Sequence, residues 1–233
     1  KDKNILEIGP GTGNLTKEIL EKNPKKVFVV EKDDNLARLL KDKFKNKIEV
    51  INDDILQTDE NLLSEHTLTV FGNLPYNIST EILINWILKI KEKVWFDCLI
   101  LMFQKEVADR IISNFNTKNY GRLTILANWR LNIKKIMDIK PNSFQPKPKV
   151  ESTVLFFEPK NNFTKFKNAK NLEKITRIFF KHRRKMLKKP FKQLFYNHEN
   201  LQKKLNIDLN LRPQNLNLET FYMLANEYEN LRS

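Results

Sequence analysis

The sequence predicts an α/β fold, in which a mostly parallel sheet carries helices on both faces and is followed by a small domain made only of helices. Two observations predict it. Up to Pro159, short apolar runs alternate with amphipathic stretches, which is typical of strands that alternate with covering helices. Beyond Pro159 only the spacing of amphipathic helices remains. We therefore expect one domain over residues 1–159 and a second over residues 160–233.

The elements of the first domain follow from these apolar runs and their flanking residues. Strands are predicted at Asn4–Ile8, Val27–Glu31, Ile48–Ile51, Thr67–Gly72, Leu99–Phe103 and Thr153–Phe157. Helices are predicted at Leu15–Lys22, Asp34–Phe44, Ser79–Lys89 with Ser79 as N-cap, and Lys105–Asn114. The apolar segment Leu123–Trp129 fits a helix or a strand. Three prolines predict an extended loop over Pro141–Lys149.

The second domain combines helical periodicity with a concentration of positive charge. Leu172, Ile175, Phe179, Met186 and Leu187 approximate one apolar face, which Pro190 interrupts, and a last helix is predicted over Leu216–Tyr228. From Lys160 to Asn206 there are fifteen Lys or Arg and two acids, and the whole chain has a net charge of +14. A lysine-rich composition explains part of the total but not the clustering. Such a one-sign surface indicates a polyanionic partner.

Composition excludes several other classes of protein. No run approaches the roughly 20 apolar residues that span a bilayer, and the single cysteine, Cys98, cannot form an internal disulfide. We therefore expect a cytoplasmic, reduced protein with no membrane partner, and a monomer. His66, His182 and His198 are scattered and form no metal-ligand spacing with Cys98, so we expect no metal.

Glycine is rare, so its positions are informative. The chain has 5 glycines, whereas average usage would place roughly 16 in this length. Gly9, Gly11 and Gly13 lie together between the first predicted strand and the first predicted helix, in the motif EIGPGTGNL. At the carboxyl end of a parallel strand, such a turn lets the backbone approach a nucleoside-containing cofactor closely.

Acidic residues follow the next two predicted strands. Glu31 ends the second strand, where an acid commonly accepts hydrogen bonds from ribose hydroxyls. Asp54 and Ile55 follow the third strand, where a carboxylate can accept from the amine of a cofactor adenine. Each acid alone also fits a solvated loop, but their serial placement favours a nucleoside site. The glycine spacing differs from the dinucleotide pattern GxGxxG, although it does not by itself exclude a nicotinamide cofactor.

The fourth predicted strand ends in the motif FGNLPYNI, whose residues suit chemistry on an adenine amine. This amine is a poor nucleophile because its lone pair is delocalised into the ring, so a catalyst should offer hydrogen-bond acceptors. The Asn73 side-chain oxygen and the Leu74 carbonyl, held by Pro75, can accept both amine hydrogens, and Tyr76 can stack on the ring. The alternative is a proline turn with a buried tyrosine.

With these motifs the chain resembles the bacterial small-subunit (16S) ribosomal RNA adenine dimethyltransferases, the kasugamycin-sensitivity family. The resemblance covers nearly the whole length. It is carried by Glu7–Thr16, Val70–Thr80, Gln104–Val107, Tyr120–Leu123, Ser143–Ser152, His182–Lys185 and Arg212–Leu216. The family also has a basic arm and helix with a Gln-Asn-Phe-Leu motif ahead of the first strand, whereas Lys1 here lies almost on that strand.

The resemblance implies a Rossmann-like methyltransferase domain with S-adenosylmethionine as cofactor. Gly9 would line its methionine part, Glu31 would bind its ribose and Asp54 its adenine. Asn73 would lie between the cofactor and the target base, and Phe144 would pack on that base opposite the tyrosine.

The implied reaction places two methyl groups on each of two adjacent adenosines near the 3′ end of small-subunit rRNA. The helical domain, with Arg183, Arg184 and Lys185, would bind phosphates of the immature small subunit. Three alternatives remain: a resistance methyltransferase of large-subunit RNA, which shares the Asn-x-Pro-Tyr core, a non-catalytic assembly factor, and a nicotinamide oxidoreductase. Tyr120–Leu123 and His182–Lys185 favour the small-subunit enzyme over the first, and intact Asn73 and Tyr76 argue against the second. No hydride-relay residue supports the third.

Overall fold

The computed structural model describes residues 1–58, 67–90, 94–145, 147–196 and 198–232. These residues form two compact units. The first comprises Lys1–Ala108 and Asn132–Pro159, and the second comprises Asp109–Leu131 and Lys160–Ser233. The segment Asp109–Leu131, which lies within the first expected domain, groups with the C-terminal helices. The roles of the two parts stay a prediction.

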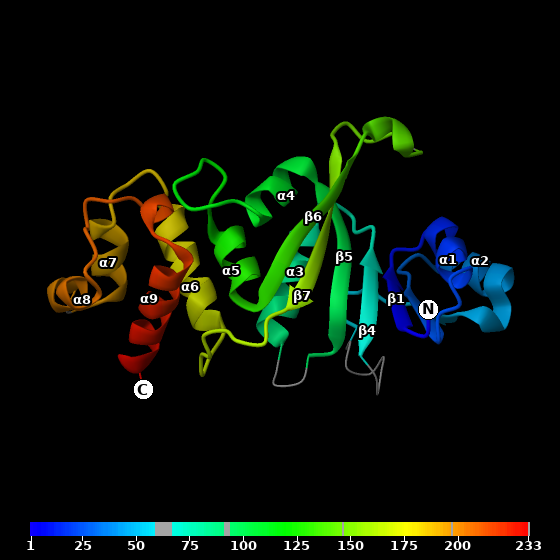
Figure 1. Cartoon of the computed structure of the whole chain (residues 1–233), viewed down its shortest axis with the longest axis horizontal. Helices are drawn as coiled ribbons and strands as arrows, with labels where there is room; N and C mark the ends of the chain where they lie inside the picture. Colours follow the sequence, from blue (N-terminus) through cyan, green and yellow to red (C-terminus); the bar gives the residue numbers. More distant parts are fainter. Residues whose placement is uncertain (59–66, 91–93, 146, 197, 233) are drawn as a thin grey trace. The chain divides into compact units, whose positions relative to one another are not determined.

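The first unit is built on a mixed sheet, in which the described residues provide seven strands (Figure 1). The strands are β1 (Asn4–Ile8), β2 (Lys26–Val30), β3 (Glu49–Ile51), β4 (Leu68–Gly72), β5 (Phe96–Gln104), β6 (Leu131–Ile139) and β7 (Ser152–Pro159). Their order is β3-β2-β1-β4-β5-β7-β6. The pairs from β3 to β5 are parallel and β5 pairs with β7 antiparallel. The carboxyl ends of β1, β2, β3 and β4 consequently lie at one edge of the sheet, where all the motifs of the first half are found.

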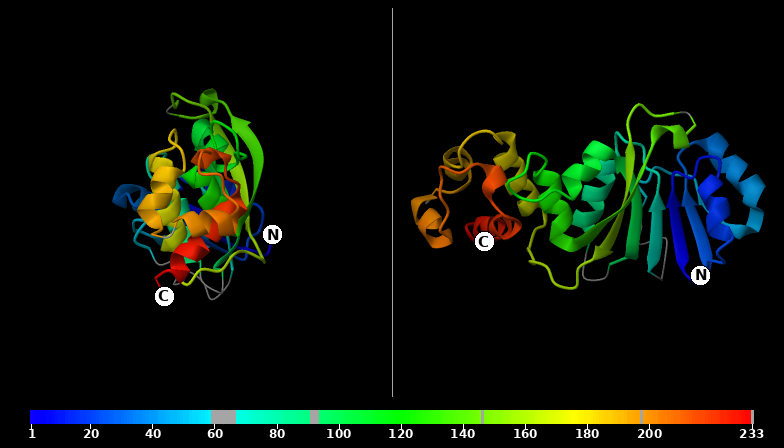
Figure 2. Two further views of the ribbon diagram at one scale, coloured as in Figure 1. Left: turned by 90° about the vertical axis from the view of Figure 1, so that its left-hand side faces the viewer. Right: turned by 45° about the horizontal axis from the view of Figure 1, so that its top comes forward.

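Helices cover both faces of this sheet. They are α1 (Asn14–Leu20), α2 (Asp34–Phe44), α3 (Ser79–Lys89) and α4 (Lys105–Ile111), with short 3-10 helices η1 (Lys45–Lys47) and η3 (Pro141–Ser143). Ile19 of α1 and Leu40 of α2 pack against Ile5 and Val29, and Figure 2 shows both helices beside the blue strands β1 and β2. Leu6, on the opposite face of β1, is also fully buried. Burial on both faces explains why the strands are continuous apolar runs.

The second unit is helical. Its elements are α5 (Arg122–Arg130), α6 (Lys170–Lys181), α7 (Lys188–Leu194), α8 (His198–Leu205), η4 (Pro213–Asn215) and α9 (Leu218–Asn230). Phe179 of α6 lies at the centre, with its ring centroid 5.7 Å from that of Phe191 and 5.6 Å from that of Phe221. The Tyr222 hydroxyl of α9 donates to the Ile125 carbonyl of α5 at 3.4 Å. This hydrogen bond, together with Trp129 of α5, whose ring centroid lies 5.1 Å from that of Phe166, joins α5 to the C-terminal unit.

Two parts of the fold were not resolved by the sequence pattern. The open segment Leu123–Trp129 is helical in α5, and the strand β6 was not predicted. β6 lies at the end of the sheet order, and neighbouring residues Ile136 and Met137 are both exposed, by 55% and 53%. An edge strand with neither face continuously buried does not show the two-residue alternation by which strands are found.

The expectation that Pro190 interrupts a helix was wrong. The helix α6 ends at Lys181, and Pro190 lies in the first turn of α7, which begins at Lys188. A proline is tolerated there because the first amide groups of a helix have no carbonyl partner within it. The expected extended loop Pro141–Lys149 likewise begins with the 3-10 turn η3, and α8 was not predicted.

Candidate active site

The glycine turn after β1 has the conformation that glycine alone adopts without strain. The φ angles are +65° at Gly9, +57° at Gly11 and +79° at Gly13. The Gly9 amide donates to the Val30 carbonyl at 3.0 Å, and a Cβ on Gly9 would lie 3.4 Å from the Asn73 carbonyl oxygen. The loops after β1 and β4 therefore meet, as a site shared by a cofactor and a target base requires.

The buried side chain of Glu7, in β1, contacts the helix that follows this turn. Its side chain is 2% exposed, and its Oε2 accepts a hydrogen bond from the Thr16 hydroxyl of α1 at 2.6 Å. Burial raises the pKa of the Glu7 carboxyl, and the Thr16 hydrogen bond opposes that shift. Glu7 thus joins the end of β1 to α1 on either side of the glycines. Glu7 begins the motif EIGPGTGNL, but this supporting role was not predicted.

Glu31, at the end of β2, lies beside the glycine turn. Its Oε2 accepts from the Gly11 amide at 3.2 Å and its Oε1 from the Asp33 amide at 3.0 Å. The side chain is 8% exposed. Since each carboxylate oxygen can accept more than one hydrogen bond, these two contacts orient Glu31 and leave acceptor capacity for ribose hydroxyls.

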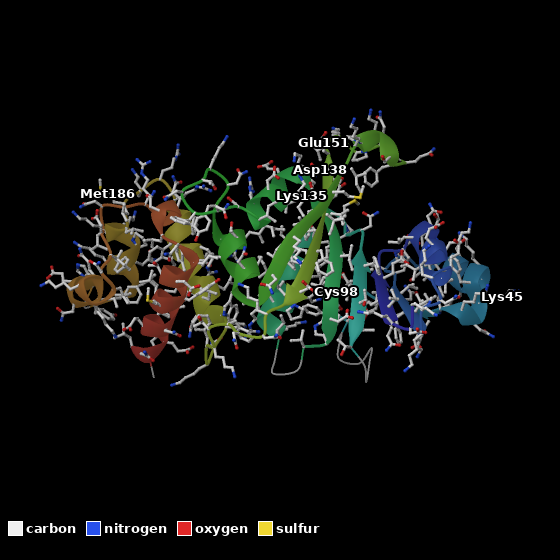
Figure 3. The ribbon with its side chains drawn as sticks, in the orientation of Figure 1. Lys45, Cys98, Lys135, Asp138, Glu151 and Met186 are labelled. Carbon is white, nitrogen blue, oxygen red and sulfur yellow. The ribbon has the colours of Figure 1, made fainter. Side chains whose placement is uncertain are left out.

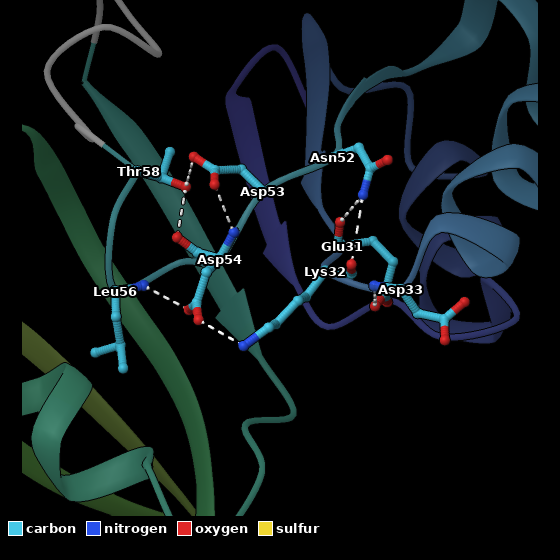
Figure 4. A network of polar contacts seen from close by, with 8 residues as sticks. All are labelled: Glu31, Lys32, Asp33, Asn52, Asp53, Asp54, Leu56 and Thr58. Carbon is cyan, nitrogen blue, oxygen red and sulfur yellow. Dashed lines mark hydrogen bonds and ion pairs between the residues drawn. The ribbon is translucent and has the colours of Figure 1, made fainter.

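Asp54 is held by a polar network that also includes Glu31 (Figure 4). Its Oδ2 lies 2.8 Å from the Lys32 Nζ, and its Oδ1 accepts from the Leu56 amide at 3.0 Å. The hydrogen bond from Lys32, and after it that from Leu56, lowers the pKa of Asp54, and the interaction with Asp54 raises the pKa of Lys32. Asp54 is therefore an ionised acceptor, as the nucleoside-site prediction requires. Ile55, predicted beside it, is buried with 7% exposure.

Lys32 is a site residue that sequence analysis missed. It follows Glu31 directly and reaches Asp54 on the loop after β3. The amide of Asn52 adds a second link between the two loops, because it donates to the Glu31 carbonyl at 3.1 Å. The run of charged residues after β2 was the signal available in the sequence, but a solvated loop shows the same pattern.

The Asn73–Tyr76 turn begins helix α3. The Pro75 carbonyl accepts from the Ile78 amide at 3.1 Å and from the Ser79 amide at 3.0 Å. The predicted capping role of Ser79 was wrong, since Ile78 occupies the N-cap position and the Ser79 hydroxyl donates to the Tyr76 carbonyl at 3.2 Å. These hydrogen bonds fix the turn at the start of α3. Asn73 is exposed, and its backbone carbonyl lies next to Gly9.

Two aromatic residues were predicted to contact the target base. Tyr76 is half-buried, and its hydroxyl oxygen lies 2.7 Å from that of Ser152 at the start of β7. Phe144 is also half-buried and lies just after η3, on the segment between β6 and β7. Both belong to the first unit. Their contact with adenine, and the catalytic roles of Asn73 and Leu74, stay predictions.

The three basic residues predicted to bind RNA differ in their surroundings. Arg183 is turned toward the protein, because its guanidinium donates to the Lys118 carbonyl, to the Thr117 carbonyl at 3.3 Å and to the Gln214 side chain at 3.4 Å. Arg184 and Lys185 are exposed. Arg183 is therefore occupied by hydrogen bonds within its own unit.

No three His, Cys, Asp or Glu side chains within the described ranges gather as metal ligands do. A membrane-crossing helix needs about 20 apolar residues, and none of the helices in the described part of the chain meets that requirement.

A Rossmann-like sheet with a nucleoside-binding glycine turn and an acceptor-rich Asn-Leu-Pro-Tyr turn defines a class, the S-adenosylmethionine-dependent methyltransferases that act on an amine. Within that class, the family model described as ribosomal RNA adenine dimethylase matches residues 1–230. The chain belongs to this family. It is an S-adenosylmethionine-dependent methyltransferase, and its substrate is ribosomal RNA.

Individual relatives agree with this assignment. The chain is 64% identical to the ribosomal RNA small subunit methyltransferase A of Pelagibacter ubique, over 99% of this chain and 88% of that protein. It is 41% identical to the protein of the same name from a Wolbachia endosymbiont of Brugia malayi, over 97% and 87%. A dimethyladenosine transferase structure from Plasmodium falciparum matches with a TM-score of 0.77 and 26% identity, over 97% and 91%. The 23S rRNA methyltransferase ErmE, at 22% identity and a TM-score of 0.68, shares the fold.

The residues present fit the cofactor. Gly9 and Gly11 have positive φ angles and bring the loop backbone next to the Asn73 turn without side chains between them. Glu31 and Asp54 have oriented acceptor oxygens, which would bind the ribose hydroxyls and the adenine amine of S-adenosylmethionine. The glycines and Asn73 would hold its methionine part.

Proposed function

We propose that this protein transfers methyl groups from S-adenosylmethionine to the exocyclic amines of two adjacent adenosines near the 3′ end of small-subunit rRNA, two on each. The single observation that carries the proposal is the contact between the glycine turn and the Asn73–Tyr76 turn, where Gly9 approaches the Asn73 carbonyl. This contact puts an acceptor-rich turn beside the predicted methionine end of the cofactor. The small-subunit substrate is supported by the names of the relatives at 64% and 41% identity.

The chain's own residues would act by orientation and hydrogen bonding. Bound S-adenosylmethionine supplies a methyl group on a positively charged sulfur. The Asn73 side-chain oxygen and the Leu74 carbonyl accept the two amine hydrogens, so that the nitrogen lone pair turns toward the methyl group. Proximity and orientation then supply most of the acceleration. Because a paired base cannot enter, the adenosine is unpaired or extruded between Tyr76 and Phe144.

The proposed partner is the immature small ribosomal subunit, which a monomer of this protein meets in the cytoplasm. Arg184 and Lys185 lie exposed in the segment between α6 and α7, within a stretch from Lys160 to Asn206 that carries fifteen basic residues. Contacts of such residues with phosphates are independent of base sequence and sensitive to salt. The helical unit would thus hold the rRNA while the first unit modifies it.

The substrate is tested by incubating the protein with labelled S-adenosylmethionine and under-methylated small subunits, followed by mapping of the product. We expect dimethylated adenosines at two adjacent positions near the 3′ end of the small-subunit RNA. Label found only in large-subunit RNA would overturn the proposed substrate in favour of the resistance methyltransferases. No label in either RNA would favour a non-catalytic assembly factor.

The role of Asn73 is tested by replacing it with alanine. Asn73→Ala should lower kcat by about 100-fold or more, the usual cost of losing an oriented hydrogen-bonding group that acts in the transition state, and should leave RNA affinity within about twofold. Asn77→Ala, also exposed in the same segment, is the matched control and should change neither. Equal losses of kcat and RNA affinity in Asn73→Ala would remove Asn73 from the catalytic role.

A further inference from the structure

The Tyr76 hydroxyl has a partner far away in the sequence. Its oxygen lies 2.7 Å from the Ser152 hydroxyl oxygen, and either group can donate the hydrogen. Ser152 is fully buried, whereas Tyr76 is half-buried. The bond therefore ties a side chain of the proposed base-binding turn to a rigid, solvent-excluded point of the sheet.

The sheet explains how Ser152 comes to this place. Ser152 is the first residue of β7 and pairs with Gln104, the last residue of β5, while the next amide of the chain, that of Lys105, donates to the Glu151 carbonyl at 2.9 Å. β5 lies between β4 and β7 in the sheet order. The Tyr76 side chain, from the turn after β4, thus reaches across the end of β5 to meet β7.

The residue after Ser152 is held as firmly. The Thr153 hydroxyl donates to Asp138 Oδ1 at 2.6 Å, and Asp138 Oδ2 lies 2.7 Å from Lys135 Nζ and 3.6 Å from Lys105 Nζ. Hydrogen bonds from Lys135 and Thr153 lower the pKa of Asp138 to about 2. Figure 3 shows Lys135, Asp138 and Glu151 together near the connected ends of β6 and β7.

The cluster of Asp138 with Thr153, Lys135 and Lys105 joins the two strands that flank the segment carrying Phe144. Asp138 lies at the end of β6 and Thr153 at the start of β7, so their hydrogen bond joins the two strands on either side of residues 140–151. Ser152, between that bond and the Phe144 segment, is fixed in turn. The start of β7 therefore holds Tyr76 directly and joins β6 at the base of the segment that carries Phe144.

We propose that Ser152 is a positioning residue, whose hydroxyl fixes the place of the Tyr76 ring for stacking on the target adenine and links that ring to the base of the Phe144 segment. This inference rests on the proposed function of Tyr76. The hydroxyl oxygen of a tyrosine lies on the axis about which its ring turns, so a hydrogen bond there fixes the first side-chain torsion and the place of the ring rather than its last torsion. The bond to a buried strand therefore holds the Tyr76 ring in one place before the base arrives.

A double-mutant cycle with Ser152→Ala, Tyr76→Phe and the combined variant tests the proposal in the protein supplied with S-adenosylmethionine and small-subunit substrate. We expect each single change to lower kcat by about fivefold, the factor that corresponds to a hydrogen bond of about 1 kcal/mol. The combined variant should be no slower than either single one, because all three lack the same bond. Losses that multiply would overturn the proposal.

A spectroscopic measurement separates positioning from stability. With 2-aminopurine in place of the target adenosine, emission is quenched when the extruded base stacks on an aromatic ring. Ser152→Ala and Tyr76→Phe should both give brighter complexes than the wild type, with unchanged affinity for S-adenosylmethionine. Ser113→Ala, which removes an exposed hydroxyl pair of 2.6 Å with Thr117, is the control. Lowered thermal stability of Ser152→Ala with unchanged kcat and emission would make Ser152 purely structural and overturn the proposal.

Two further outcomes are distinguishable. If Ser152→Ala fails to fold, Tyr76→Phe alone decides, since an unchanged kcat and emission in that variant would overturn the inference and losses in both would support it. Tyr76→Ala separates this inference from the proposed function. A fully active Tyr76→Ala would remove Tyr76 from base stacking altogether, whereas an inactive Tyr76→Ala beside a normal Ser152→Ala would overturn only the positioning role.

Discussion

At the scale of single residues, Glu7 is a buried carboxyl next to the glycine turn of the candidate active site. Its carboxyl is bound by the Thr16 hydroxyl, yet burial raises its pKa. A group whose pKa is raised on folding stabilises the fold at pH values below its unfolded pKa, and this contribution is lost as pH rises through the folded pKa. At neutral pH the ionised carboxylate of Glu7 therefore lowers the free energy of unfolding. Its neutral form, at low pH, does not.

We predict that Glu7→Gln gains stability relative to the wild type as pH rises from about 4 to about 8. Glutamine keeps an acceptor for Thr16 and carries no charge to bury. Thermal unfolding across this range measures the difference in Tm between the two proteins. The control is Glu18→Gln on the exposed side of α1, whose difference should not follow this course. A Glu7→Gln difference that stays constant with pH would contradict the assignment.

Gly13 must be glycine for two separate reasons, its backbone conformation and the lack of space beside it. Its φ is +79°, and a Cβ there would lie 2.4 Å from a ring carbon of Phe44. The left-handed conformation alone costs a residue with a side chain about 1–2 kcal/mol. The clash adds to it because Phe44 belongs to the buried cluster between α2 and the sheet.

We predict that Gly13→Ala destabilises the protein by more than about 2 kcal/mol and weakens cofactor binding, measured by denaturant unfolding and calorimetric titration. Adding Phe44→Leu should recover the steric part of the loss in Gly13→Ala and leave the conformational part. Gly121→Ala is the control, since its φ of −174° is extended and a Cβ would meet its nearest atom at 3.8 Å. Equal losses for the two glycines would argue against this account.

At the scale of elements, the segment between α6 and α7 divides its basic residues between two tasks. Arg183 binds the carbonyls of Thr117 and Lys118 and thereby holds the loop that leads into α5, while Arg184 and Lys185 point into solvent. In the same segment Met186 is 53% exposed and Leu187 is fully buried. This short connection thus holds the helical unit together through Arg183 and exposes positive charge to solvent through Arg184 and Lys185.

We predict that Arg183→Ala lowers the Tm by about 2–4 °C, the effect of about 1 kcal/mol in a protein of this size, and leaves the salt dependence of RNA binding unchanged. The variant with both Arg184→Ala and Lys185→Ala should do the opposite. Its plot of log affinity against log salt should be less steep by about 1.4 to 1.8, for two lost phosphate contacts. A flatter plot for Arg183→Ala at unchanged Tm would place Arg183 on the RNA.

At the scale of the whole molecule, charge and chemistry are carried by different parts of the chain. The stretch from Lys160 to Asn206 holds fifteen basic and two acidic residues of a chain whose net charge is +14. The cofactor loops, by contrast, use acidic side chains such as Glu31 and Asp54 as acceptors. RNA affinity and cofactor affinity should consequently respond to different conditions.

We predict that raising salt from about 50 to about 200 mM lowers rRNA affinity by about 10³–10⁵, if about six to ten phosphates are contacted. The affinity for S-adenosylmethionine, which depends on short-range hydrogen bonds, should change by less than about threefold. Filter binding and calorimetry measure the two. A comparable loss in both would show that the charge acts on the site itself rather than on the RNA.

The accuracy of prediction from the sequence depended on whether a feature is set by neighbouring residues or by residues that are distant in the sequence. Strands and helices in the first half were predicted to within a few residues, because burial on both faces makes each strand an apolar run. The same rule failed at β6, where Ile136 and Met137 are exposed at the sheet edge. Pro190 was misjudged because its effect depends on whether a helix begins or continues there.

The sequence by itself determined the cofactor class and the chemistry on the adenine amine. Gly9 and Gly11, Glu31, Asp54 and the Asn73–Tyr76 turn all come shortly after a strand, and parallel strands bring their carboxyl ends to one edge without further information. Only the tertiary structure decided which side chains support them. Ser152 meets Tyr76 across 76 positions and Arg183 meets Lys118 across 65, and contacts at such separations depend on how strands and helices pack, which no local pattern encodes.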